Sequence, residues 1–200
     1  AARLLVTFDA GRTWVSAEQG LHNVFVGALA TAAAQGQSIL YAGTDLGVHI
    51  TSDLFGLAGV VGWDNDLDLR QKVFAAVPHP AQPQTLFIGT EEAGVWKSAD
   101  WGHNWKQFSS GLLPVHIHAL AQEPRLPYTL FAGTSGGLFV SRDNGQTWKR
   151  GTPGATLANV YSVLADPSLP GVAYFGADDG QVFRTINNGE SFEFVSTGLP

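Results

Sequence analysis

The stretch Ser141-Arg142-Asp143-Asn144-Gly145-Gln146-Thr147-Trp148 decides the fold, because related versions of it recur along the chain. Each version combines a small hydroxyl residue, Asp or Asn, Gly and an aromatic residue. The other versions lie at residues 9–14, 98–105 and 185–192, with an eroded copy at 51–53. Their acidic or amide positions, 9, 53, 100, 143 and 187, are spaced by 44, 47, 43 and 44 residues. A fixed period of this size indicates a solenoid or a propeller.

Each period also contains short apolar runs bounded by glycine. These runs are rich in aromatic and β-branched residues, as strands are. They lie at 39–44, 85–90, 129–134 and 172–177, and further runs at 73–77, 117–121 and 160–164 are each closed by a proline. Four short strands per period, without helical periodicity, are what one propeller blade requires. The sequence therefore predicts an all-β fold, a β-propeller of four-stranded antiparallel blades.

The repeated motif resembles the Asp-box, or bacterial neuraminidase (BNR), repeat, and the resemblance covers nearly the whole chain. Proteins with this repeat include sialidases, xyloglucan-cleaving glycosidases, sortilin-type receptors and photosystem II assembly factors. The resemblance implies a propeller and leaves the function open, because function depends on the sites that a fold carries.

The motif residues themselves are expected to be structural. The Asp143 carboxylate can accept N–H groups of its own turn, Gly145 can adopt positive φ, and Trp148 can return into the sheet stack as a large buried aromatic residue. We therefore assign no catalytic residue to the motif.

Counted in these periods, the chain comprises about four and a half blades. A half blade at 1–20 precedes blades at about 22–68, 70–110, 115–153 and 158–198. Propellers usually contain about four to eight blades and often close by pairing their termini. The chain ends on a fourth strand, which cannot complete the half blade. The count predicts a part of a larger ring, or a ring that a second copy or another chain completes.

Composition excludes several classes of function. The net charge is −6 and the basic residues are scattered, so a nucleic-acid partner is not expected. No run approaches the roughly 18 apolar residues of a membrane span, which predicts no membrane insertion. The absence of cysteine excludes disulfides and thiolate chemistry.

A chain without methionine that starts at Ala1 suggests a processing site or a truncation. Together with the absence of cysteine, this start favours an exported protein.

Strand direction predicts which loops face a ligand. In an antiparallel blade the loops after the second strand open at the end opposite the box turns, beside the entry to the innermost strand. The acidic residues of these loops are Asp45, Glu91, Glu92, Asp178 and Asp179. Aligned on the closing prolines, the entries form a column of Lys72, His116 and Asn159 with Asn23, and a column of Phe74, His118 and Tyr161 with Phe25. Polar residues backed by aromatic ones suit a sugar or a peptide terminus.

Two further patterns concern metals and partners. His116 and His118 share one face of a strand, but no third ligand of suitable spacing follows, so we predict no metal and no cofactor. The segment 64–68 resembles the start of a calcium loop, yet Leu69 occupies the glycine position. We expect a solvated loop here, and we predict a partner contact at Trp63, Asp64 and Asp66.

Glycosidase chemistry commonly needs two carboxyl groups roughly 5 to 10 Å apart. In this sequence only pairs from different blades, such as Asp45 with Glu92, could provide them, and the opening motif of the sialidase arginine cluster is absent. The first hypothesis is therefore a non-catalytic propeller that binds a protein partner or serves as an assembly scaffold. The alternatives are a propeller that binds or cleaves glycans, and a structural subunit whose ring another chain completes.

Overall fold

The computed structural model describes residues 4–7, 9–17, 20–21, 24–34, 37–52, 64–67, 71–112, 116–151, 159–178 and 180–195. Their regular structure consists of β-strands, paired in one two-stranded and four four-stranded sheets. All of the pairings between these strands are antiparallel. The predicted all-β architecture of four-stranded antiparallel sheets is confirmed.

The sheets follow one another along the chain. The N-terminal hairpin contains β1 (Leu5–Val6) and β2 (Val15–Ser16). The first sheet contains β3 (Val26–Ala34), β4 (Gln37–Thr44), β5 (Gly47–Thr51) and β6 (Asp64–Leu67). The second contains β7 (Val73–Pro78), β8 (Leu86–Thr90), β9 (Val95–Ser98) and β10 (Trp105–Gln107). The third contains β11 (Ile117–Gln122), β12 (Leu130–Thr134), β13 (Gly137–Ser141) and β14 (Lys149–Arg150). The fourth contains β15 (Val160–Ala165), β16 (Ala173–Ala177), β17 (Val182–Thr185) and β18 (Glu193–Phe194).

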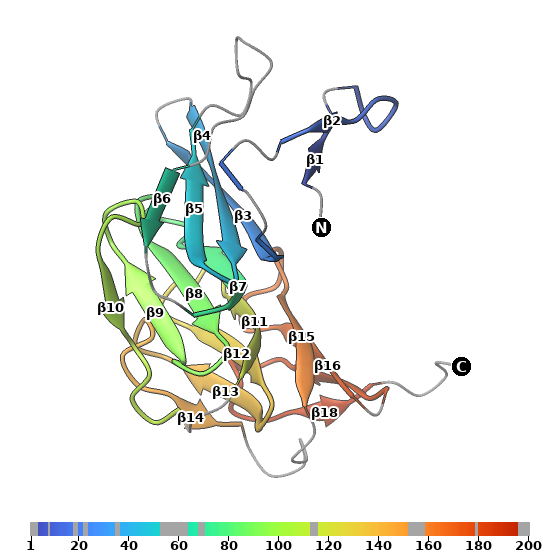
Figure 1. Cartoon of the computed structure of the whole chain (residues 1–200). Coiled ribbons are helices and arrows are strands. Elements are labelled where there is room, and N and C mark those ends of the chain that lie inside the picture. The colour runs from blue at the N-terminus through green and yellow to red at the C-terminus, as the bar shows by residue number, and fades with distance from the viewer. Residues whose placement is uncertain are drawn as a thin grey trace.

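The four sheets succeed one another around a common centre (Figure 1). Each sheet is a meander that starts at its inner strand, and the inner strands β3, β7, β11 and β15 contact one another in that order. The core is divided among the interfaces between successive sheets. Tyr41 of the first sheet clusters with Ile88 of the second, and Phe131 of the third clusters with Phe175 of the fourth. Burial of apolar area between the sheets therefore holds the arrangement together.

The box turns connect the third and fourth strands and have one hydrogen-bond pattern. The Asp143 carboxylate accepts bonds from Ser141 Oγ and from the Thr147 N–H, both at 2.8 Å, and Ser141 Oγ accepts the Gly145 N–H at 2.9 Å. Asn144 and Gly145 have φ of 61° and 85°. The turns at Asp9, Asp100 and Asn187 repeat these bonds. Asp143 and Gly145 therefore have the predicted structural role, whereas Asp53 lies outside the described residues.

The box aromatic residues pack against the preceding sheet. Trp148 is 3% exposed and clusters with Phe87 of the second sheet, and Phe192 packs onto the cluster that contains Phe131. Trp14 departs from the predicted burial, since 56% of it is exposed. Trp14 belongs to the N-terminal hairpin, and within the described residues no other sheet packs against its ring.

Acid should loosen the box turns. Hydrogen bonds from Thr13 hold the pKa of Asp9 at about 2, and bonds from Asn104 lower the pKa of Asp100. Burial alone would raise the pKa of Asp143, but bonds from Thr147 and Ser141 outweigh it and lower that pKa as well. A carboxyl group whose pKa is lower in the folded state stabilises the fold at pH values above its unfolded-state pKa of 3.8. This stabilisation is lost as the pH falls through the folded-state pKa.

We expect the melting temperature to fall between pH of about 5 and about 2, because all three carboxylates lose their bonds as they protonate. The matched control is the variant with Asp9→Asn, Asp100→Asn and Asp143→Asn. Asn187 shows that an amide makes the same turn, since it accepts the Ser191 N–H at 3.0 Å. Thermal unfolding followed by circular dichroism should show a shallower decline in this variant, and an unchanged decline would contradict the assignment.

Candidate functional site

In every four-stranded sheet, the loop after the second strand is bonded to the residue that precedes the inner strand. The Asp45 N–H donates to Phe25 O at 3.1 Å, and the Glu91 N–H donates to Lys72 O at 2.9 Å. The corresponding bonds join Ser135 to His116 at 3.1 Å and Asp178 to Asn159 at 3.0 Å. These loops and the entries to the inner strands therefore meet at one end of the sheets, as strand direction predicts.

The carboxylates of these loops bond to the chain itself. Asp45 Oδ1 accepts the N–H of Phe25 at 2.8 Å. Asp178 Oδ2 accepts from Asn159 Nδ2 at 2.7 Å. Glu91 pairs with Lys72 Nζ at 3.1 Å. The predicted ligand groups Asp45, Lys72, Glu91 and Asp178 thus hold the loops onto the inner strands, while Asp179 lies outside the described residues.

The first column of the sequence alignment needs a correction. The bond between Asp45 and Phe25 places Phe25, and not Asn23, with Lys72, His116 and Asn159. The register on the inner strands then aligns Gly27 with the second column, Phe74, His118 and Tyr161. The alignment used the proline that closes each inner strand, and β3 has no such proline to fix its register.

A β-bulge produces the second column. The pairing of the inner strand with its neighbour shifts at the same place in all four sheets, after Val26, Val73, Ile117 and Val160. The extra residue is Gly27, Phe74, His118 or Tyr161. A bulge re-aims a side chain outside the regular alternation of a strand. No sequence signal marks these bulges, because the residue types at them differ from sheet to sheet.

The aromatic side chains of the two columns, together with Phe25, lie at this end of the sheets, and we call them the aromatic rim: Phe25, Phe74, His116, His118 and Tyr161. The His118 and Tyr161 rings lie 4.6 Å apart between centroids, and the His116 and His118 rings lie 6.4 Å apart. A Cβ at Gly27 would lie 3.4 Å from the Phe74 ring and 3.5 Å from the Phe25 ring. Phe25 and Tyr161 are 52% and 54% exposed, so the rim offers aromatic surface to a ligand.

His118 adds a polar group to this rim. Burial lowers its pKa, and the charge of His116 lowers it further, so the ring is neutral at pH 7. Its Nε2 atom is buried and has no hydrogen-bond partner among the described residues. A neutral imidazole can donate or accept one bond at this atom, depending on its tautomer.

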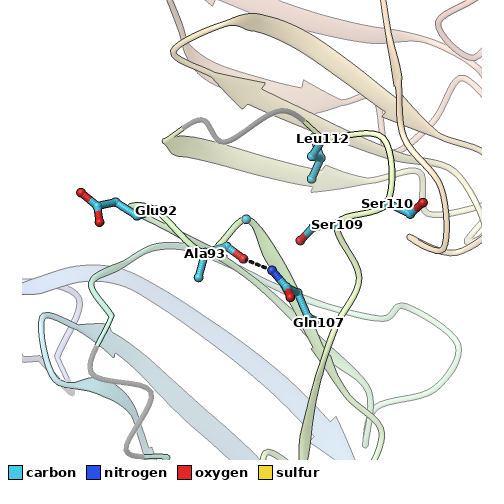
Figure 2. Close-up of a pocket in the computed structure, with 7 residues that line it drawn as sticks. Glu92, Ala93, Gln107, Ser109, Ser110 and Leu112 are labelled. Atoms are coloured by element: carbon cyan, nitrogen blue, oxygen red, sulfur yellow. Dashed lines mark hydrogen bonds between the residues drawn. The ribbon is translucent and has the colours of Figure 1, made fainter.

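A hollow of about 430 Å³ lies at the same end of the second sheet (Figure 2). Glu92, Ala93 and Gly94 line it from the loop after β8. The other lining residues are Gln107, at the end of β10, and Ser109, Ser110 and Leu112, in the segment leading to the third sheet. Gln107 Nε2 donates to Ala93 O at 2.8 Å, and Ser109 Oγ donates to Val95 O at 3.0 Å. Glu92 lies at the edge with its carboxylate directed away from Gln107 (Figure 2).

The hollow shares only Glu92 with the predicted site. The segment 107–112 was not predicted, although strand direction places every connection from a fourth strand to the next inner strand at this end. The lining hydroxyl, amide and carbonyl groups can hydrogen-bond a sugar or a peptide.

The predicted partner contact falls partly outside the described residues. Trp63 is not among them. Asp64 and Asp66 lie on β6, whose backbone pairs with β5 in the register of Ile50 with Asp64. The expected solvated loop is therefore a strand at residues 64–67, because these residues complete the first sheet.

The described residues contain no group of three or more His, Asp or Glu residues that could hold a metal ion. In the same ranges no helix has the length and hydropathy of a membrane span.

The fold is of the propeller type, since solved structures of that type superpose on nearly the whole chain. An ancestral GH74 enzyme has a TM-score of 0.77 at 14% identity, over 98% of this chain and 28% of that one. YCF48 bound to D1 peptide has a TM-score of 0.61 at 18% identity, over 92% and 58%. The extracellular domain of BT4673 from B. thetaiotaomicron has a TM-score of 0.66 at 14% identity, over 98% and 33%. No family model and no curated protein matches the sequence.

The chain spans less than two thirds of the length of each of these proteins, between 28% and 58%. Identities this low support the shared fold alone.

Proposed function

We propose that this chain is a non-catalytic Asp-box propeller that binds a protein partner through the aromatic rim. Its blades correspond to residues of about 22–68, 70–110, 115–153 and 158–198, after a half blade at 1–20. The observation that carries the proposal is the exposure of Phe25 and Tyr161 at the inner-strand entries, beside the unpartnered Nε2 of His118. Exposed aromatic side chains with nearby polar groups are enriched where proteins bind one another.

The carboxylates argue against hydrolysis by this part of the chain. A glycosidase of the common type needs one carboxyl group as acid and a second as base or nucleophile. Asp45 and Asp178 are bonded to the inner-strand entries, and Glu91 is paired with Lys72. Among the described residues of these loops, only Glu92 keeps its carboxylate clear of such a bond.

The related structures are compatible with this proposal, since YCF48 was solved with a bound D1 peptide. Glycan binding is the second candidate. It is supported by the polar hollow beside Glu92 and by the GH74 enzymes that share the fold. We also propose an exported protein, and the extracellular domain of BT4673 supports that location.

The test is selection of ligands from a random peptide library displayed on phage, in parallel with binding of xyloglucan oligosaccharides. Peptides selected on the unmodified chain should bind the Tyr161→Ala variant at least about tenfold more weakly, as expected for loss of an aromatic anchor. Tyr128→Ala is the matched control. Tyr128 is 50% exposed, and its carbonyl accepts the Asn144 N–H, so it lies at the opposite end beside a box turn.

Two outcomes would contradict the proposal. One is peptide binding that the Tyr161→Ala and His118→Ala variants leave unchanged. The other is binding of the oligosaccharides, without selected peptides, that Glu92→Gln abolishes, which would favour the glycan alternative.

A further inference from the structure

The three internal interfaces between sheets repeat one set of contacts. Each sheet carries three residues that pair side by side across its first, second and third strands. These rows are Ala30, Tyr41 and Ile50 in the first sheet, Val77, Phe87 and Lys97 in the second, and Ala121, Phe131 and Val140 in the third. Tyr41, Phe87 and Phe131 are all 0% exposed.

The box turn of the following sheet covers each row. A Cβ at Gly102 would lie 2.7 Å from Ile50, one at Gly145 would lie 3.1 Å from Phe87, and one at Gly189 would lie 2.8 Å from Val140. Real Cβ atoms essentially never approach as closely as at Gly102 and Gly189, and seldom as closely as at Gly145, so the glycine permits the contact. The box aromatic residue of the same turn then packs into the same cluster, as Trp148 does beside Phe87.

The fourth sheet has the same row, formed by Leu164, Tyr174 and Arg184, and we call it the docking row. Leu164 is 63% exposed, whereas Ala30, at the equivalent position, is 9% exposed. Tyr174 with Arg184 repeats the pair of Phe87 with Lys97. In the second sheet, Lys97 Nζ lies 5.2 Å from the centroid of the Phe87 ring, and burial lowers the Lys97 pKa. A basic residue in this row is therefore compatible with a covering sheet.

The N-terminal hairpin carries the complementary surface, a box turn that could cover such a row. Leu4 and Val6 pack against the first sheet beside Leu40 and Ala42, as a preceding sheet would. On its other side, Leu5 is 45% exposed and Trp14 is 56% exposed. The Gly11 turn has φ of 87°, and a Cβ there would meet only Trp14, at 3.8 Å, within the described residues.

We propose that the docking row binds the N-terminal hairpin of a second copy of this chain. In this contact the Gly11 turn lies on Tyr174, in the way that the Gly145 turn lies on Phe87, and Leu5 and Trp14 cover Leu164. The occupant is a second copy because the chain itself carries both halves of an interface that it already forms three times. The contact is heterologous, so each copy offers one hairpin and one docking row.

The experiment is sedimentation velocity of the 200-residue chain over a range of concentrations, with the Leu164→Asp and Leu5→Asp variants. The unmodified chain should associate as its concentration rises. Each variant alone should associate at least about tenfold more weakly, since each places a charge in the interface. Tyr128→Asp, at an exposed residue away from both surfaces, should associate like the unmodified chain. Circular dichroism melting checks that each variant is folded.

An equimolar mixture of the two variants gives the sharper result. Leu164→Asp retains the hairpin and Leu5→Asp retains the docking row, so the mixture should form a one-to-one dimer that neither variant forms alone. A monomeric unmodified chain, association that Leu164→Asp leaves unchanged, or a mixture that stays monomeric would each overturn the proposal. Peptide binding at the aromatic rim is read in a separate assay, so either proposal can fail without the other.

Discussion

Phe131→Ala should lower the free energy of unfolding by about 3–5 kcal/mol, the usual cost of truncating a buried phenylalanine to alanine. Phe131 is 0% exposed on β12 and belongs to the cluster between the third and fourth sheets. Its ring also lies against Gly189, where a Cβ would be 3.1 Å away. The substitution removes apolar contacts from both sheets, and the two packed sheets can relax only partly into the cavity that it leaves.

Phe194→Ala is the matched control for this prediction. Phe194 is 51% exposed on β18 and retains an edge-on contact with Phe183 at 5.7 Å between centroids. We expect a loss below about 1.5 kcal/mol, the most that an aromatic pair adds beyond area burial. Urea denaturation midpoints measure both variants. Equal losses would mean that the interface between the sheets does not carry the stability.

Gly111→Ala should lower the free energy of unfolding by about 2–4 kcal/mol, through backbone strain and overpacking. Gly111 has φ of 85°, and a Cβ there would collide with the carbonyl of Trp148. The collision falls beside the bond from the Trp148 N–H to Ser110 O, which is 2.8 Å long and ties the loop to the third sheet. Because Ser110 and Leu112 line the hollow, the substitution should also change its shape.

Gly180→Ala separates the two causes of this loss. Gly180 has φ of 74°, close to that of Gly111, but a Cβ there would meet nothing within 4 Å. The loss of stability in the Gly180→Ala variant therefore measures the cost of the left-handed backbone conformation alone, which is about 1–2 kcal/mol. Thermal and urea unfolding compare the pair. If both variants lose the same stability, the contact with Trp148 contributes nothing.

The strands could be predicted because their signals are local. The run predicted at 129–134 is β12 at Leu130–Thr134, and the run predicted at 172–177 is β16 at Ala173–Ala177. The role of Asp143 could be predicted for the same reason, since its bonds reach no further than Ser141 and Thr147. Glycine, hydroxyl and carboxylate groups a few residues apart are sufficient to define such turns.

From the sequence, the candidate site could be located at one end of the sheets, but the contacts within it could not be predicted. Strand direction placed the loops correctly, but it does not show that the Asp45 carboxylate accepts the N–H of Phe25, twenty residues away. The position of Phe25 in the first column could not be predicted, because β3 lacks the closing proline on which the alignment of the other inner strands depends. The hollow beside Glu92 is lined by residues 92–94 and by residues between 107 and 112, which lie apart in the sequence and meet only in the folded chain.

The repeated bulge has a consequence for how this protein can change. Phe74, His118 and Tyr161 each occupy a position that the pleat does not assign to either side of its sheet, while the buried residues Val73, Ile117 and Val160 beside them keep the register. Substitutions at these three positions should therefore change the proposed binding surface and leave the register of the inner strands in place. Gly27 is the exception, because a Cβ there would lie 2.6 Å from the Val73 carbonyl oxygen. In the proposed function, the inner strands thus separate the residues that would contact a partner from the residues that keep the register of the fold.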